Sequence, residues 1–165
     1  MTVSVRAATP ADAGEFARIH TACFDQAWNE ESFRHLLQRP GAVALIARHA
    51  DATQSQGFIL VQVAAGESEI ISIGTLPGRR RSGIAAALLA EAAAEAVRRH
   101  AEEMFLEVAE DNEAALALYA GFGFVAAGRR HSYYIRAGRP AADALMLHAA
   151  LPLQNHGNST RSRLD

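Results

Sequence analysis

The feature that most constrains the fold of this chain is the stretch of residues 75–89, where an apolar run passes through a short loop into a long Ala-rich segment. Three isoleucines within residues 69–76 are typical of a buried strand, and Pro77 and Gly78 end it. Residues 82–99 then repeat their apolar side chains at helical spacing. The sequence therefore predicts a strand, a loop and a helix in direct succession.

The loop between these two elements is a candidate anion site. A helix that begins directly after a Gly-bearing loop leaves backbone N–H groups unpaired at its positive end. Ser82 is expected to cap this helix, Gly83 and Ala85 leave room for a ligand, and arginines at positions 79–81 add positive charge. The expected ligand is a phosphate or pyrophosphate. The alternative is that the arginines only solvate the loop and Ser82 caps an ordinary helix.

Composition limits the classes of function. The chain has 165 residues, half of them hydrophobic, which suits one domain with a full core. A net charge of -2 gives no general reason to expect nucleic acid or an anionic membrane surface as a partner. All sixteen basic residues are Arg, so Lys-based Schiff-base chemistry and a Walker-type phosphate lysine are excluded.

Cysteine and histidine usage bears on compartment and metals. Cys23 is the lone cysteine, and no charged-then-apolar leader precedes the segment 11–24, so a reducing cytoplasm is expected. No apolar run approaches membrane-spanning length. The histidines show no ligand spacing, so no metal is expected.

The patterns along the chain predict eleven elements, in the order β-α-α-β-β-β-α-β-α-β-β. Helices are expected at 11–24, 29–39, 82–99 and 112–121, with Asn29 and Asn112 as caps and Gly121 as a left-handed C-cap. Strands are expected at 2–7, 42–48, 57–64, 69–76, 104–109, 130–135 and 142–151, with a further strand start at 122–125 and a loop at 136–141. This order predicts one α+β domain (α/β mixed) over residues 1–151, with a mixed sheet covered on both faces, and a polar, disordered tail at 152–165.

Two blocks of the sequence resemble a known family. Arg80, Arg81, Ser82, Gly83, Ile84 and Ala85 match the acyl-CoA pyrophosphate motif of the GNAT N-acetyltransferases: Gln or Arg, two residues, Gly, one residue, then Gly or Ala. Residues 106–108, 112–115, 118–119, 123–124 and 128–130, with the Tyr133–Tyr134 pair, resemble the RimI branch, the ribosomal-protein alanine N-acetyltransferases. The similarity extends from Trp28 to residues 143–146. Thr75 stands where Val is usual, and Ala27 precedes Trp28 where the branch often has Pro.

The resemblance implies a GNAT-like, mostly antiparallel twisted sheet of about seven strands with about four helices. It also implies acetyl-CoA as co-substrate. The acetyl group and pantetheine arm would contact Ile73, Gly74 and Thr75, and Asn112 would add a contact. The pyrophosphate would lie on Arg80, Arg81, Ser82, Gly83, Ile84, Ala85 and Ala86.

The same resemblance implies the catalytic pair. A peptide α-amine has a pKa of about 8 and is mostly protonated at neutral pH, so a base helps to supply the free nucleophile. Glu107 matches the branch's general base and Tyr119 its general acid. Direct attack needs no covalent acyl-enzyme, which fits a chain whose only cysteine lies far from the motif in sequence.

Each of these residues also has a purely structural interpretation. Tyr119 could be a core aromatic, Glu107 an exposed strand residue and Asn112 only a helix cap. Four aromatic residues could either fill the core or line the acceptor groove: Trp28, Phe33, Tyr133 and Tyr134.

The function expected from the resemblance is acetyl transfer from acetyl-CoA to a primary amine, with the N-terminal α-amine of a ribosomal protein as the acceptor. The alternatives are acetylation of a small-molecule amine or of a lysine, and a non-catalytic module that only binds acyl-CoA.

Overall fold

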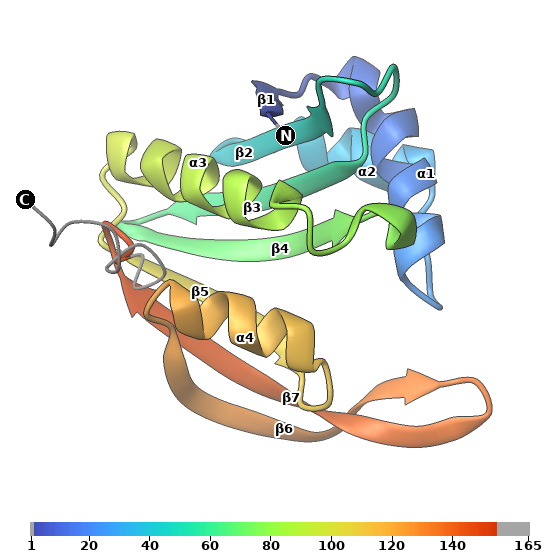
Figure 1. The fold of residues 1–165 in the computed structure, drawn as a ribbon. Helices are drawn as coiled ribbons and strands as arrows, with labels where there is room; N and C mark the ends of the chain where they lie inside the picture. The colour runs from blue at the N-terminus through green and yellow to red at the C-terminus, as the bar shows by residue number, and fades with distance from the viewer. Residues whose placement is uncertain (1, 155–165) are drawn as a thin grey trace, which may run out of the picture.

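The computed structural model describes residues 2–154 and contains a seven-stranded sheet with helices on both faces (Figure 1). The strand order is β1-β2-β3-β4-β5-β7-β6, and every neighbouring pair is antiparallel except β4 and β5. The strands are β1 Val3–Ala7, β2 Ala42–His49, β3 Gly57–Ala64, β4 Glu67–Thr75, β5 Glu103–Ala109, β6 Val125–Arg136 and β7 Arg139–Ala150. The helices are α1 Ala13–Cys23, α2 Glu30–Leu37, α3 Ile84–Arg98 and α4 Glu113–Gly121, with 3-10 turns at Pro10–Asp12 and Pro77–Arg79. The predicted α+β class and element order are confirmed.

Side-chain caps fix the starts of two helices as the sequence predicts. Asn29 Oδ1 accepts a hydrogen bond from the Ser32 N–H at 2.8 Å, and Asn112 Oδ1 accepts one from the Ala115 N–H at 3.2 Å. The predicted C-cap is wrong, because Gly121 is the last residue of α4 and the left-handed residue is Gly123, with φ at 87°. After α4, the left-handed turn falls two residues beyond the end of the helix, where the chain enters β6.

Two hydrophobic clusters lie on opposite faces of the sheet. The first joins α3 and α4 to β2 through β7, with Leu88, Leu89 and Met104 fully buried. The second joins α1 and α2 to β2, β3 and β4 around Phe16, Phe33 and Phe58, whose ring centroids lie 5.0 to 5.8 Å apart. The sheet is therefore buried on both faces over β2 and β3, which explains the nearly continuous apolar sequences of these two strands.

The last hairpin differs from the prediction. β6 already begins at Val125 and β7 begins at Arg139, so only residues 137 and 138 connect them, and the predicted loop at 136–141 is wrong. Gly138, with φ at 70°, makes this tight turn possible. Leu151 and Leu153 pack against the first cluster, and residues 155–165 of the predicted tail lie outside the described residues. Within residues 2–154, no helix is long and apolar enough to cross a membrane.

Gly57 provides a test of the packing between α3 and the sheet. A Cβ at this position would lie 2.5 Å from Ile84 Cγ2 and 3.2 Å from Leu88 Cδ1. Gly57→Ala should therefore lower the free energy of unfolding by about 1–3 kcal/mol through overpacking, as measured by urea denaturation. Gly121→Ala is the matched control, because a Cβ there meets nothing within 4 Å. Equal stabilities of the two variants would contradict this packing.

Candidate active site

The site is built around an opening between β4 and β5. These parallel strands pair only over Glu67–Glu69 and Glu103–Phe105. Beyond that point β4 stays paired with β3 as far as Thr75, and β5 stays paired with β7 as far as Ala109. The facing edges therefore carry backbone N–H and C=O groups that no ladder between the two strands uses. Ile73, Gly74 and Thr75 lie on one edge of this opening and Glu107 on the other, which is the arrangement that the predicted site requires.

The N-terminus of α3 follows directly from the end of β4. Gly83 is the N-cap residue and has a left-handed φ of 88°, and Arg81 is also left-handed at 60°. The first intrahelical bond runs from Ala87 N–H to Gly83 C=O, at 3.0 Å. The amides of Ile84, Ala85 and Ala86 thus have no acceptor within the helix, and such amides can bind an anion.

Ser82 does not cap α3, so this prediction is wrong. Its hydroxyl donates to the Arg79 carbonyl and closes the loop upon itself. The left-handed turn at Gly83 directs the chain into the helix without a side-chain cap. A Cβ on Gly83 would meet nothing within 4 Å, which leaves the approach to the helix start open.

Cys23 lies beside the end of β4, although 52 residues separate it from Thr75 in sequence. Its thiol donates to the Thr75 carbonyl at 3.2 Å. The interpretation that the cysteine is remote from the motif is therefore wrong in space. Burial raises the pKa of the Cys23 thiol, and nearby Arg80 only partly offsets this effect. The thiol stays protonated at neutral pH, which suits a packing and hydrogen-bonding role rather than a nucleophile.

Thr75 carries a polar atom without a partner. Its Oγ1 is buried and makes no hydrogen bond within the described part of the chain. Buried polar atoms are nearly always hydrogen-bonded, so this hydroxyl indicates a ligand group beside the end of β4. The usual Val of the family motif could not make such a bond.

Glu107 on β5 is held by an ion pair that the sequence did not predict. Arg130 Nε of β6 lies 3.1 Å from Glu107 Oε1, and the Glu107 side chain is 22% exposed. The guanidinium of Arg130 also lies 5.4 Å from the ring centre of Tyr133. Glu107 is thus accessible at the opening but fixed in orientation by β6.

Tyr119 on α4 is part of the core, and its predicted role as the acid stays a prediction. It is 4% exposed, and its ring packs edge-on against Phe124 with centroids 5.5 Å apart. Burial raises the pKa of the Tyr119 phenol, with a smaller contribution from Tyr134. The phenol therefore remains protonated across the physiological range and can act as a donor.

Tyr134 connects the two predicted catalytic residues. Burial raises the pKa of its phenol, and the negative charge of Glu107 adds to this effect. Tyr134 thus lies within electrostatic reach of both Glu107 and Tyr119, whereas Tyr133 is half exposed on the surface. Of the four undecided aromatic residues, Phe33 is fully buried core, and a site role for Tyr134 stays a prediction.

His20 is a structural residue on the α1 side of the site that the sequence patterns did not reveal. It is 3% exposed, and its Nδ1 accepts a hydrogen bond from the Trp28 N–H at 3.1 Å. Its ring stacks on Phe24 and on Trp28, with centroids 4.3 and 4.9 Å away. The imidazole therefore holds the connection between α1 and α2, whose two large aromatic side chains remain partly exposed.

Asn112 caps α4, and its predicted contact with the co-substrate stays a prediction. No three His, Cys, Asp or Glu side chains within residues 2–154 lie close enough together to hold a metal ion.

Comparison with known proteins defines the class of the fold and site. Residues 14–124 match the acetyltransferase (GNAT) family, and the chain belongs to this family. It is 33% identical over 143 residues to N-alpha-acetyltransferase RimI of Mycobacterium tuberculosis strain H37Rv, covering 84% of this chain and 89% of that protein. It is also 36% identical to ribosomal protein bS18-alanine N-acetyltransferase of Escherichia coli strain K12 over 77 residues. This match covers 47% of this chain and about half (52%) of the length of that relative.

Solved structures agree on the fold. The crystal structure of the ribosomal-protein-S18-alanine N-acetyltransferase from Escherichia coli superimposes with a TM-score of 0.83 at 23% identity, covering 94% of this chain and 98% of that one. Arabidopsis thaliana NAA60 in complex with acetyl-CoA gives a TM-score of 0.78 at 19% identity, covering 91% and 99%. The GNAT fold predicted from the motif is therefore confirmed.

His20 provides a pH test of the α1–α2 connection. Burial lowers its pKa to about 4, whereas an unfolded chain has a histidine pKa of about 6.5. Between these values the unfolded state binds more protons, so stability falls as pH falls from about 6.5 to about 4. His20→Phe should lose this part of the slope in Tm against pH, while the exposed His35→Gln variant keeps it. Identical slopes in the wild type and His20→Phe would contradict the burial of a neutral imidazole.

Proposed function

We propose that this protein is an acetyl-CoA-dependent N-acetyltransferase that acts on a protein N-terminal α-amine. The observation that carries the proposal is the opening between β4 and β5, with Glu107 on one of its edges and Tyr134 near both Glu107 and the buried Tyr119. A base, a protonated donor and an open backbone edge are the groups that direct acyl transfer to an amine needs. The names of the RimI relatives support a ribosomal protein as the acceptor, and hence a cytoplasmic reaction.

The residues at the opening fit acetyl-CoA. The unpaired amides of Ile84, Ala85 and Ala86, with Arg80 and Arg81 of the preceding loop, would hold the pyrophosphate. The open edge of β4 at residues 73–75 would bind the amides of the pantetheine arm as a neighbouring strand would. The unpartnered Thr75 hydroxyl supports a polar ligand at this edge. Bound acetyl-CoA supplies an activated acyl group as a thioester.

Two residues of the protein carry out the proton transfers, Glu107 as the general base and Tyr119 as the general acid. Glu107 accepts a proton from the acceptor ammonium, and the free amine attacks the acyl carbon. As the carbon–sulfur bond breaks, Tyr119 donates its phenolic proton to the sulfur and regains one from solvent. Its buried phenol is protonated at working pH, which is the state that this step requires. Glu107 releases its first proton to solvent and then accepts the remaining proton from the nitrogen of the tetrahedral intermediate, so that one proton is released overall for each acetyl group transferred.

The loop before α3 can be tested by binding alone. Gly83 has a φ of 88°, so Gly83→Val introduces a β-branched residue where only glycine is unstrained. We expect the Kd for acetyl-CoA, measured by calorimetry, to rise about tenfold, which corresponds to about 1.4 kcal/mol. Arg79→Ala should change it much less, because Arg79 already faces Asp51 at 3.9 Å. The reverse ranking would show that the site is misplaced.

The catalytic roles can be tested separately from binding. Tyr119→Phe keeps the ring packed against Phe124 but removes the donor, so kcat should fall by about 10²-fold while the Kd for acetyl-CoA stays within a factor of two. CoA release with an N-terminal peptide panel and with a polyamine panel measures kcat and identifies the acceptor class. An unchanged kcat would remove Tyr119 from the acid role. Wild-type binding without CoA release from any amine would instead support a non-catalytic acyl-CoA-binding module.

A further inference from the structure

β6 contains a wide irregularity next to the site. Arg130 lies opposite Ala144 and Tyr134 opposite Ala142, so β6 advances four residues while β7 advances two. Ser132, within this bulge, has a left-handed φ of 50°. The two consecutive tyrosines at the end of the bulge pack against each other, with ring centroids 5.3 Å apart, and the Tyr133 ring lies 5.4 Å from the Arg130 guanidinium that pairs with Glu107. Tyr133 is half exposed, while Tyr134 lies near Glu107. Such bulges re-aim side chains beside functional sites.

One carboxylate on β7 holds the bulge from the opposite strand. Asp143 accepts hydrogen bonds from the Ser132 N–H at 2.8 Å and from Arg129 Nη1 at 2.8 Å, and it lies 3.1 Å from His131 Nδ1. The Ser132 N–H and Arg129 together lower the pKa of Asp143 to about 2. Its carboxylate is therefore ionised at any working pH and stabilises the left-handed residue at the centre of the bulge.

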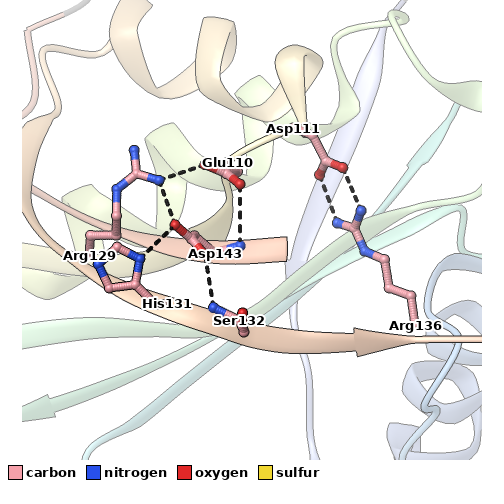
Figure 2. Close-up of polar contacts among 7 residues, drawn as sticks. All are labelled: Glu110, Asp111, Arg129, His131, Ser132, Arg136 and Asp143. Atoms are coloured by element: carbon pink, nitrogen blue, oxygen red, sulfur yellow. Dashed lines mark hydrogen bonds and ion pairs between the residues drawn. The ribbon is translucent and has the colours of Figure 1, made fainter. Parts of the chain in front are cut away.

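Arg129 and one further arginine, Arg136, anchor β6 on either side of the bulge (Figure 2). Before it, Arg129 Nη1 lies 2.6 Å from Glu110 Oε2. After it, Arg136 binds both oxygens of Asp111, at 2.5 and 2.7 Å, and its side chain is only 14% exposed. The Asp111 side chain is 55% exposed, but a bidentate pair with a shielded guanidinium fixes geometry better than most exposed pairs do.

The two acidic partners are neighbours in the connection between β5 and α4. That connection follows Glu107 on β5 and precedes Tyr119 on α4. We name the pairs Glu110–Arg129 and Asp111–Arg136 the turn clamp. Through it, the segment that carries Tyr134 is tied at both ends to the short turn between the two predicted catalytic residues.

We propose that the turn clamp positions Tyr134 to hydrogen-bond the acceptor at the amine end, which makes Asp111 and Arg136 positioning residues that control acceptor affinity. This inference rests on the proposed function, since it assigns a substrate contact within the same site. Each charge of the turn clamp is neutralised by its partner, so the clamp does not attract the acceptor electrostatically. Its effect on acceptor affinity comes from the position in which it holds the Tyr134 phenol.

The test uses the full chain and breaks the clamp without removing a catalytic group. Arg136→Gln and Asp111→Asn should each lower kcat/KM for an N-terminal peptide by about tenfold, mainly by raising KM. This loss is smaller than the roughly 10²-fold loss of rate that a 1 Å misplacement costs. The exchanged pair Arg136→Asp with Asp111→Arg should recover part of this loss. The Kd for acetyl-CoA should stay within a factor of two. Arg98→Gln, which removes an ion pair on α3, is the matched control and should change none of these values.

Coupling to Tyr134 distinguishes positioning from general damage. Tyr134→Phe should lower kcat/KM in the wild type, but by a smaller factor in the Arg136→Gln background. The ring ¹³C signals of Tyr134 report the surroundings of this side chain without any turnover, and their loss in Tyr134→Phe assigns them. Relative to the wild type, Arg136→Gln should shift these signals, whereas Arg98→Gln should not.

Failure of this inference and failure of the proposed function give different results. Wild-type turnover with unchanged kcat/KM in the clamp variants, or fully additive effects of Arg136→Gln and Tyr134→Phe, would overturn the inference alone. A wild-type protein that acetylates no amine would overturn the proposed function. In that case unshifted Tyr134 signals in Arg136→Gln would also overturn the positioning role, and shifted signals would support it.

Discussion

The early end of pairing between β4 and β5 is the constraint on which the rest of this structure depends. A parallel pair that continued to Thr75 and Ala109 would satisfy its own backbone groups and leave nothing for a ligand. Because the ladder stops after Glu69 and Phe105, the two strand edges separate toward their C-terminal ends. The cost is a set of backbone groups that need other partners, and under the proposed function the pantetheine arm of acetyl-CoA would supply them. The ladder between β4 and β5 thus ends after three paired positions, and the opening beyond it is the physical basis of the proposed site.

The elements on either side of the opening supply different chemistry. β4 leads through a left-handed turn to the amides of α3, which favour an anion. β5 carries Glu107 and leads to α4, which carries Tyr119 in a dry environment. The long hairpin of β6 and β7 then covers this second side, and its ion pairs with the turn after β5 bring Arg130 and Tyr134 to the same point. The donor side therefore relies on backbone geometry, whereas the acceptor side relies on side chains held by charge.

The parts of the molecule that sequence reasoning predicted are those with local causes. Asn29 and Asn112 cap their own helices, and the periodicity of residues 82–99 is a property of that segment alone. Ser82 and Gly121 were misassigned because the left-handed turns fall on Gly83 and Gly123, a choice that depends on how the loop meets the sheet. The hydrogen bond from Cys23 to Thr75, the buried His20 and the pairs of Arg130 and Arg136 join segments far apart in sequence, and no local pattern marks them. The bulge around Ser132 is likewise fixed by Asp143 on the partner strand.

The most direct test of the central claim is mass spectrometry of peptides incubated with the protein and acetyl-CoA, using each peptide with a free and with a blocked N-terminus. The structure predicts the mass gain of one acetyl group on the α-amine of free peptides, matched by equal release of CoA, and no gain on blocked ones. Acetyl groups that appear equally on blocked peptides, or acetyl-CoA that binds with no acetylated product from any peptide, would contradict transfer to an N-terminal amine at this opening.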